Sequence, residues 1–136
     1  MIFLSFFLSF TLWANPFIRL DKFSTEEFKV PERGILMFMS EGCVHCKAQV
    51  RDFQSCVAKS VPITLFMEGK NEDRLRKDLR RKPLPYPVYW TTAEIKAQFE
   101  VGQATPVSVL VSPKGKQKIE GRLECEKLQP FLDKLF

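Results

Sequence analysis

Apolar and polar residues follow patterns along this chain that predict most of its helices and strands. Residues 35–39 and 63–67 are mostly apolar runs of strand length, which is typical of strands buried on both faces of a sheet. Between the two runs, apolar residues recur at helical spacing. They predict a helix that begins at Cys43 and ends at the break formed by Ser60, Val61 and Pro62.

The middle of the chain is predicted to hold two further helices. Residues 71–81 have two leucines one helical turn apart among charged residues, which indicates an amphipathic surface helix. Residues 82–87 contain three prolines and are predicted to be an extended connector. Thr91 and Glu94 have the spacing of a capping box, which predicts a short helix that stops at Gly102.

The last third of the chain is predicted to be a β-hairpin followed by a helix. Residues 107–111 are apolar and β-branched, residues 112–115 are turn formers, and residues 117–123 alternate as a return strand. The spacing of Leu128, Phe131, Leu132 and Leu135 at i, i+3, i+4 and i+7 indicates a terminal helix. Its start depends on Pro130, because proline is tolerated in the first turn of a helix and kinks it further in.

These elements follow the order strand, helix, strand, helix, helix, strand, strand, helix, with residues 26–28 before them as either a short helix or an extended lead-in. This order is typical of an α/β sheet with helices on both faces. The helical crossovers make the first strands parallel, whereas the closing hairpin is antiparallel. The sequence therefore predicts a central mixed sheet.

The N-terminal block of the chain differs from everything that follows. Residues 1–14 hold no charged side chain. Their apolar run is shorter than the about 20 residues that cross a bilayer, but it fits the ~7–15 apolar residues of a secretory signal, with the small Ala14 before the cut. We predict a signal peptide over 1–14, a single domain over 15–136, and a secreted or periplasmic location. An uncleaved membrane anchor is the alternative, because no Lys or Arg precedes the run.

Composition and charge further narrow the classes of protein to which this chain can belong. The chain has 136 residues, of which 45% are hydrophobic and 27% charged, which indicates one globular domain and excludes a disordered chain. The net charge is +5, and its basic residues are densest in residues 74–82. Glu72 and Asp73 precede these bases, an order that suits the dipole of a solvated surface helix. We therefore expect no nucleic-acid partner, and we expect a monomer.

Two cysteines have the spacing of a redox pair. Cys43, Val44, His45 and Cys46 lie where the first predicted strand turns into a helix. Unpaired N–H groups and the positive end of the helix dipole stabilise a thiolate at the first cysteine. Cys46 follows one turn later on the same face. We therefore expect Cys43 to attack a partner disulfide and Cys46 to resolve the mixed disulfide.

With this motif, residues 33–136 resemble the thioredoxin superfamily, and more closely its secreted thiol–disulfide oxidoreductases, including the cytochrome-maturation and thiol-reductase branch. The resemblance rests on Cys43-Val44-His45-Cys46, on Thr105 and Pro106 before the hairpin, and on the hairpin and terminal helix. It implies a thioredoxin fold with a cis peptide bond before Pro106, facing the cysteines. It also implies a substrate groove in which the backbone of Thr105 pairs with a bound peptide or thiol.

Two residues depart from the family pattern. Gly42 stands where a tryptophan usually precedes the first cysteine, which widens the rim of the site. Met37 stands where thioredoxins have a buried acid that assists proton transfer. Glu41 is the nearest other proton acceptor, but we favour its interpretation as an exposed loop acid.

His45 is the only histidine of the chain. Its imidazolium, placed between the two cysteines, is expected to stabilise the Cys43 thiolate and so to make the disulfide a stronger oxidant. The disulfide-donating members of the family often have a histidine there, whereas the rest of the chain resembles the reductase branch. The direction of exchange stays open.

Three other roles for the cysteines are less well supported by the sequence than the redox role. Covalent haem attachment needs Cys-x-x-Cys-His, and Lys47 stands in place of that histidine. A zinc site on all four cysteines lacks a second Cys-x-x-Cys. A purely structural Cys43–Cys46 bond closes too tight a loop to gain much entropy.

Cys56 and Cys125 complete the set of four cysteines. Cys56 ends a helix that runs about 15–20 Å from the active-site edge, whereas Cys125 begins a helix expected to start near that edge. We therefore expect Cys56 to be a buried thiol and Cys125 to be partly exposed. A disulfide between them is the alternative.

The leading hypothesis is an exported thiol–disulfide oxidoreductase with Cys43 and Cys46 as catalytic residues, His45 as the residue that tunes the thiolate, and Thr105 and Pro106 in the substrate groove. It needs no metal and no cofactor beyond its own disulfide. Its partners are protein thiol or disulfide substrates and a redox partner protein, with membrane contact only through an uncleaved N-terminal segment. The rival hypothesis is a redox-inactive binding module that uses the Thr105-Pro106 groove.

Overall fold

A computed structural model of this protein describes residues 16–136, in which a seven-stranded mixed sheet is covered by helices. The predicted signal peptide or anchor over residues 1–14 lies outside the described residues. The elements are, in chain order, β1 (Pro16–Arg19), β2 (Ser24–Glu27), β3 (Gly34–Ser40), α1 (Val44–Cys56), β4 (Ile63–Glu68), α2 (Glu72–Arg81), β5 (Val88–Trp90), α3 (Ala93–Gln98), β6 (Val107–Ser112), β7 (Gly115–Glu120) and α4 (Cys125–Leu135).

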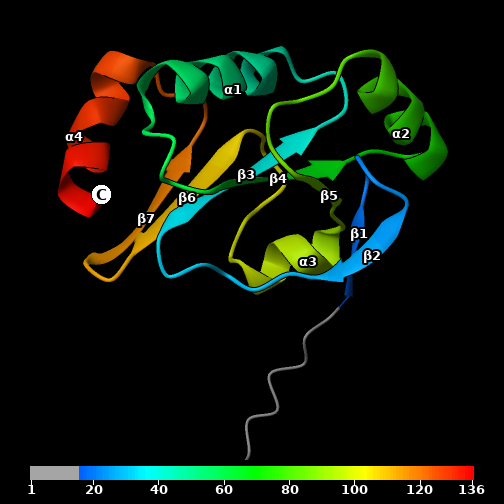
Figure 1. The fold of residues 1–136 in the computed structure, drawn as a ribbon, viewed down its shortest axis with the longest axis horizontal. Helices are drawn as coiled ribbons and strands as arrows, with labels where there is room; N and C mark the ends of the chain where they lie inside the picture. The colour runs from blue at the N-terminus through cyan, green and yellow to red at the C-terminus, as the bar shows by residue number, and fades with distance from the viewer. Residues whose placement is uncertain (1–15) are drawn as a thin grey trace, which may run out of the picture.

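The central strand β3 separates two hydrophobic clusters. Because alternate side chains of a strand point to opposite faces, Met37 and Met39 join the cluster that also contains residues of α1, α2 and α4. Leu36 and Phe38 join the other cluster, against which Ile95 and Phe99 near α3 pack. Figure 1 shows α1, α2 and α4 on one face of the sheet and α3 on the other. The predicted α/β class, with helices on both faces, is confirmed.

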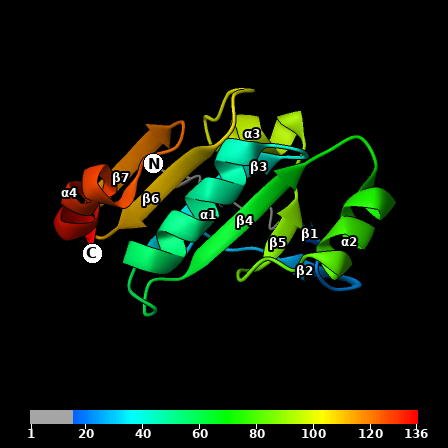
Figure 2. The same ribbon diagram turned by 90° about the horizontal axis from the view of Figure 1, so that it is seen from above.

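Strand directions place the start of α1 at one edge of the sheet. The strand order is β2-β1-β5-β4-β3-β6-β7. β3 and β4 are parallel, as predicted, and β6 is antiparallel to both β3 and β7. The carboxyl ends of β3 and β4 therefore meet the amino end of β6, and α1 begins at that edge (Figure 2).

The sequence pattern missed three strands. β1 and β2 form a hairpin at the end of the sheet, where residues of β2 are alternately half-buried and exposed. Of the two predictions for residues 26–28, the extended one is confirmed, since β2 ends at Glu27. β5 is three residues long and directly follows the proline-rich connector. Short strands of this kind give weak periodicity, and their pairing partners are distant in sequence. The return strand β7 also ends earlier than predicted, at Glu120 rather than Leu123.

The structure corrects one predicted helix cap. The cap of α3 is Thr92, whose hydroxyl accepts the N–H of Ile95, and not Thr91 as the capping-box spacing suggested. The reason is that the N–H of Thr91 bonds to the carbonyl of Met67 at 3.0 Å, so Thr91 still continues the sheet. In α4, Pro130 lies inside the helix and not in its first turn.

The basic helix α2 has the predicted amphipathic form. Asn71 caps it, Leu75 and Leu79 are buried, and most of its basic side chains are exposed. Two of them, Arg76 and Arg80, lie over the ring of Phe23 at 5.3 and 4.5 Å. Within residues 16–136, the helices are too short or too polar to span a bilayer.

Candidate active site

The turn from β3 into α1 places Cys43 at the helix N-terminus. Gly42 adopts a φ of 75°, a left-handed conformation that suits glycine, and so reverses the chain after Ser40. Cys43 itself is the N-cap, one residue before the first helical position, and its Sγ accepts the N–H of Cys46 at 3.2 Å. The sulfur therefore takes one of the free amide groups at the positive end of the helix.

Cys43 and Cys46 form a disulfide, with their Cα atoms 5.2 Å apart. Their exposure differs, because Cys43 is partly exposed whereas Cys46 is completely buried. An incoming thiol therefore reaches Cys43 first. This geometry suits Cys43 to form a mixed disulfide and Cys46 to be the protected second sulfur.

His45 lies in the first turn of α1 with an exposed side chain. It stands between the two cysteines, and the first turn of α1 contains no acidic residue that would oppose a positive charge there. The role of His45 in tuning Cys43 stays a prediction.

Thr105, which precedes Pro106, lies against Cys43 although it is 62 residues away in sequence. The Thr105-Pro106 peptide bond is cis. The hydroxyl of Thr105 lies 3.8 Å from Cys43 Sγ and 2.7 Å from the hydroxyl of Ser40. Since a threonine hydroxyl has a single proton, its donation to Cys43 requires that Ser40 donates to Thr105. This chain of hydroxyls directs a proton toward the sulfur.

Sequence reasoning did not identify Ser40 as part of the site. The sequence did contain a clue to Ser40, because it is the polar residue that ends the apolar run of β3 just before the cysteine motif. Its contact with Thr105, in contrast, depends on the antiparallel pairing of β3 and β6.

An ion pair with one buried partner connects the two loops that flank the site. Lys96 is 2% exposed, and its Nζ lies 2.9 Å from Glu68 Oε2. The same ammonium donates to the carbonyl of Gln103 at 3.5 Å, in the loop before Thr105. The backbone carbonyl of Glu68 accepts the N–H of Glu41 at 2.9 Å, in the loop before Cys43. Sequence reasoning missed this pair, because nothing local distinguishes Lys96 from an exposed lysine.

Met37 and Glu41 occupy different environments. Met37 is completely buried in β3. The carboxylate of Glu41 lies at the surface and pairs with Arg74 at 3.2 Å, with its side chain 30% exposed. This pairing supports the loop-acid interpretation of Glu41.

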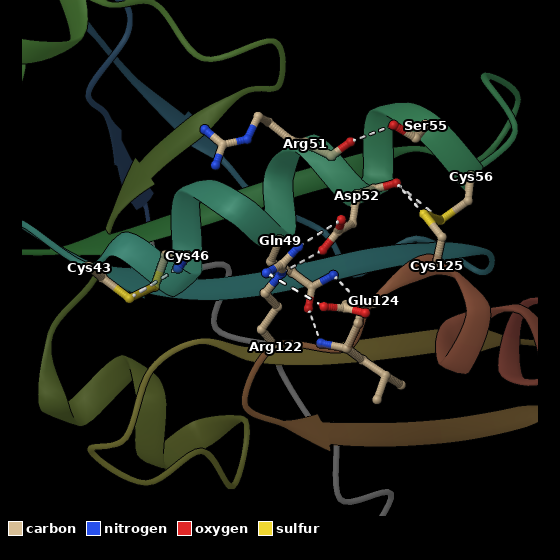
Figure 3. Close-up of polar contacts among 11 residues, drawn as sticks. Cys43, Cys46, Gln49, Arg51, Asp52, Ser55, Cys56, Arg122, Glu124 and Cys125 are labelled. Atoms are coloured by element: carbon tan, nitrogen blue, oxygen red, sulfur yellow. Dashed lines mark hydrogen bonds and ion pairs between the residues drawn. A yellow bond between two sulfur atoms is a disulfide. The ribbon is translucent and has the colours of Figure 1, made fainter.

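Cys56 and Cys125 form a second disulfide, with their Cα atoms 5.9 Å apart, so the expectation of two free thiols is wrong. The error lay in the assumed start of the last helix. After β7 the chain runs along α1 before α4 begins, and Figure 3 shows this connection beside Gln49 and Asp52. A stretch of about four extended residues covers ~13 Å, which carries Cys125 from the active-site edge to the far end of α1.

Gln49 and Asp52 hold that connection in place. Gln49 is 1% exposed, accepts the N–H of Leu123 at 2.6 Å and donates to its carbonyl at 3.0 Å. The guanidinium of Arg122 donates to the carboxylate of Asp52 at 2.8 Å, and this contact raises the pKa of Arg122. The backbone carbonyl of Asp52 lies 3.0 and 3.1 Å from the sulfurs of Cys56 and Cys125.

The two disulfides lie at opposite ends of α1 (Figure 3). A helix of 13 residues spans roughly 20 Å. One zinc ion therefore cannot be shared by all four cysteines. Among the residues that the structure describes, no cluster of three or more histidine, cysteine or acidic side chains is arranged to hold a metal.

Fold and site together define a protein with the thioredoxin fold and a Cys-x-x-Cys disulfide at the start of its first helix. No family model and no curated protein matches the sequence. Solved structures do match it. StoA from Bacillus subtilis superimposes with a TM-score of 0.62 at 21% identity, over 87% of this chain and 98% of that one.

Two further structures show the same fold. A secreted disulfide oxidoreductase from Mycobacterium tuberculosis, described as homologous to Escherichia coli DsbE, has a TM-score of 0.64 at 13% identity, over 89% of this chain and 93% of its own. The exposed lipoprotein thioredoxin Etrx1 from Streptococcus pneumoniae has a TM-score of 0.69 at 15% identity, over 88% and 98%. At these identities the likeness shows the fold.

Proposed function

We propose that this protein is an exported thiol–disulfide oxidoreductase that exchanges its Cys43–Cys46 pair with protein thiols. The observation that carries the proposal is the setting of Cys43. Cys43 is partly exposed, its sulfur accepts an N–H at the start of α1 and lies beside Thr105, and Cys46 is buried. That arrangement stabilises a thiolate at the one sulfur that a partner can reach.

The exchange conserves sulfur and electrons in both directions. In the oxidising direction a substrate thiolate attacks Cys43 Sγ, the bond to Cys46 breaks, and Cys46 leaves as the thiolate. A second substrate thiolate then attacks the substrate sulfur of the mixed disulfide, so that the substrate is oxidised by two electrons and Cys43 is released reduced. In the reducing direction the same steps run backward. A redox partner protein resets the pair, and no cofactor other than the disulfide is required.

The proposed location is secreted or periplasmic. It is supported by residues 1–14, which are uncharged and mostly apolar. It is also supported by the words "secreted" and "exposed lipoprotein" in the descriptions of two structures with this fold. Disulfides persist in such compartments.

The test is exchange activity of the protein and of its Cys43→Ser variant. We expect the protein to reduce insulin or to oxidise a dithiol peptide, and we expect the variant to do neither. The rival hypothesis of a redox-inactive binding module predicts no activity in the unaltered protein with both reagents.

A further inference from the structure

A groove of about 870 Å³ lies between α1 and α2. Figure 2 shows the two helices over the same face of the sheet, with β4 and β5 between them. Four residues of α1 at positions i, i+3, i+4 and i+7 face the groove, namely Lys47, Val50, Arg51 and Gln54. Leu75 and Leu79 of α2 face them, and Met39 and Met67 line the groove from β3 and β4.

One end of the groove lies at the three residues that precede the reactive cysteine. Ser40, Glu41 and Gly42 line this end, and Gly42 directly precedes Cys43. A Cβ atom built on Gly42 would meet nothing within 4 Å, so the mouth is open at this point. Along α1 the groove extends from Lys47 to Gln54, about 10 Å. A polypeptide joined to Cys43 through a mixed disulfide can therefore enter the groove with about three extended residues.

The rim of the groove carries unbalanced positive charge. Its two carboxylates are already paired, Glu41 with Arg74 at 3.2 Å and Asp78 with Arg81 at 2.8 Å. Three other cations line the groove with exposed side chains, and none of them forms an ion pair with another described residue: Lys47, Arg51 and Lys82.

The lining between these cations is apolar. Its floor is formed by core side chains, among them Met67 and Leu79, that are almost completely buried. Its accessible apolar part is the proline-rich connector, with Pro83 and Pro85 exposed and Leu84 half-buried. A bound segment that is complementary to both the apolar lining and the cations therefore combines apolar side chains with carboxylates.

We propose that this groove binds an extended, acidic and apolar segment of the partner protein, next to the cysteine that exchanges with Cys43. The inference rests on the proposed function and adds the substrate class to it. The apolar side chains of the segment pack over Pro83, Leu84 and Pro85, the accessible apolar part of the lining. Its carboxylates pair with Lys47, Arg51 and Lys82. Partners with such a segment react faster because the groove attracts and orients them before the sulfurs meet.

The test compares two peptides that contain the same disulfide-bonded cysteine. One has Glu and Leu residues beside the cysteine, and the other has Lys and Leu. The rate constant for exchange with the full chain is measured for each peptide and divided by the rate constant for a small neutral disulfide, bis(2-hydroxyethyl) disulfide. We expect this ratio to be about tenfold higher for the acidic peptide at low salt, and we expect the difference to shrink at ~150 mM salt.

A charge-reversed protein and a matched control test whether the preference for the acidic peptide arises in the groove. In Arg51→Glu/Lys82→Glu the preference for the acidic peptide should disappear or invert. Lys127→Glu/Lys134→Glu changes the net charge equally, at exposed residues of α4 that line no part of the groove, and should retain the preference. If the reversed protein is unstable, Arg51→Gln/Lys82→Gln should still lose most of the preference.

Three results would overturn the proposal. The first is an equal ratio for the two peptides, and the second is an equal loss of preference in the groove and control variants. The third is that removal of residues 1–14 speeds the exchange of both peptides and leaves no difference between them. That result would assign the groove to the chain's own N-terminal segment. Failure of the proposed function looks different, because then no disulfide reacts, including the small neutral one.

Discussion

At the scale of single residues, the surroundings of Cys43 favour a negative charge on its sulfur. The N–H of Cys46, the hydroxyl of Thr105 and the start of α1 all favour a negative Cys43, and the exposed His45 lies two residues away. None of these groups acts in the same way on Cys46, which is buried. The two sulfurs are therefore expected to differ in reactivity.

The first prediction is that the pKa of Cys43 in the reduced protein lies well below the unperturbed value of ~8.5. The rate of alkylation by iodoacetamide, followed against pH in a Cys46→Ser variant, reports this pKa. A midpoint above pH 8 would contradict the prediction.

The second prediction concerns His45→Ala. Loss of the imidazolium destabilises the Cys43 thiolate in the reduced form, whereas the disulfide carries no charge at that sulfur. The disulfide should become less oxidising, by about 30 mV for each unit of Cys43 pKa. Equilibration with a glutathione buffer measures the potential. If His45→Ala changes neither the titration of Cys43 nor the potential, His45 is a spectator and the tendency toward oxidation loses its support.

The ion pair of Lys96 and Glu68 gives the third prediction. Their side chains are 3% and 39% exposed, so the lysine is the partner that cannot be hydrated when the pair is broken. Glu68→Met should therefore lower the free energy of unfolding more than Lys96→Met does, by about 2–3 against about 1 kcal/mol. Urea unfolding of both variants and of the double variant measures the costs and their coupling. Equal costs, or a larger cost for Lys96→Met, would show that the burial of the lysine does not decide the energy.

At the scale of elements, helix α1 is held at both of its ends. Its first residues carry the redox pair, its middle is bound to the chain before α4 through Gln49, and Cys56 at its end is bonded to Cys125. The second disulfide is about 20 Å from the first. It is therefore expected to stabilise the position of α1 without taking part in exchange.

The fourth prediction tests this division of roles. The Cys56–Cys125 bond joins residues 69 apart, so its removal in Cys56→Ser/Cys125→Ser should lower the free energy of unfolding by about 3–4 kcal/mol while exchange activity remains. The matched control is Cys43→Ser/Cys46→Ser, which opens a loop of only three residues and should cost less stability while activity is lost. Urea unfolding and insulin reduction measure the two properties. Loss of exchange in the Cys56 and Cys125 variant, with the fold intact, would instead make the second disulfide part of the redox path.

At the scale of the whole molecule, an arginine network joins the N-terminal hairpin to the sheet. Arg19 is 8% exposed, donates to Asp21 and Glu26, and lies 5.4 Å from the ring centre of Tyr89 in β5. Burial raises the pKa of Asp21, but the hydrogen bond and charge of Arg19 outweigh it and hold that pKa below its ordinary value. The hydrogen bond from Arg19 likewise lowers the pKa of Glu26.

The fifth prediction follows from these lowered pKa values. Carboxylates with a lower pKa in the folded state stabilise it above the unfolded values of 3.8 and 4.5, and this contribution is lost as pH falls through the lowered values. Urea midpoints between pH 7 and pH 2 should therefore fall less steeply below about pH 4 in Arg19→Met than in the unaltered protein. Lys116→Met, at an exposed residue that forms no ion pair with another described residue, serves as the control. Identical acid slopes in all three proteins would show that the network does not contribute.

Local patterns were enough to predict the elements that depend on local forces. The apolar run of β3, the amphipathic α2 and the placement of Cys43 before a helix are properties of neighbouring residues, and the structure has all three. The strands β1, β2 and β5 were missed. They are only three or four residues long, and their stability comes from pairing with distant strands.

The sequence by itself determined the central mixed sheet, its two apolar faces and the position of the redox pair, because each follows from the spacing of residues along one or two elements. Only the tertiary structure decided the Cys56–Cys125 bond, the Glu68 and Lys96 pair and the groove beside Cys43. The physical reason is the same in all three cases. Each one brings together segments far apart in the chain, through connections whose paths no local periodicity specifies.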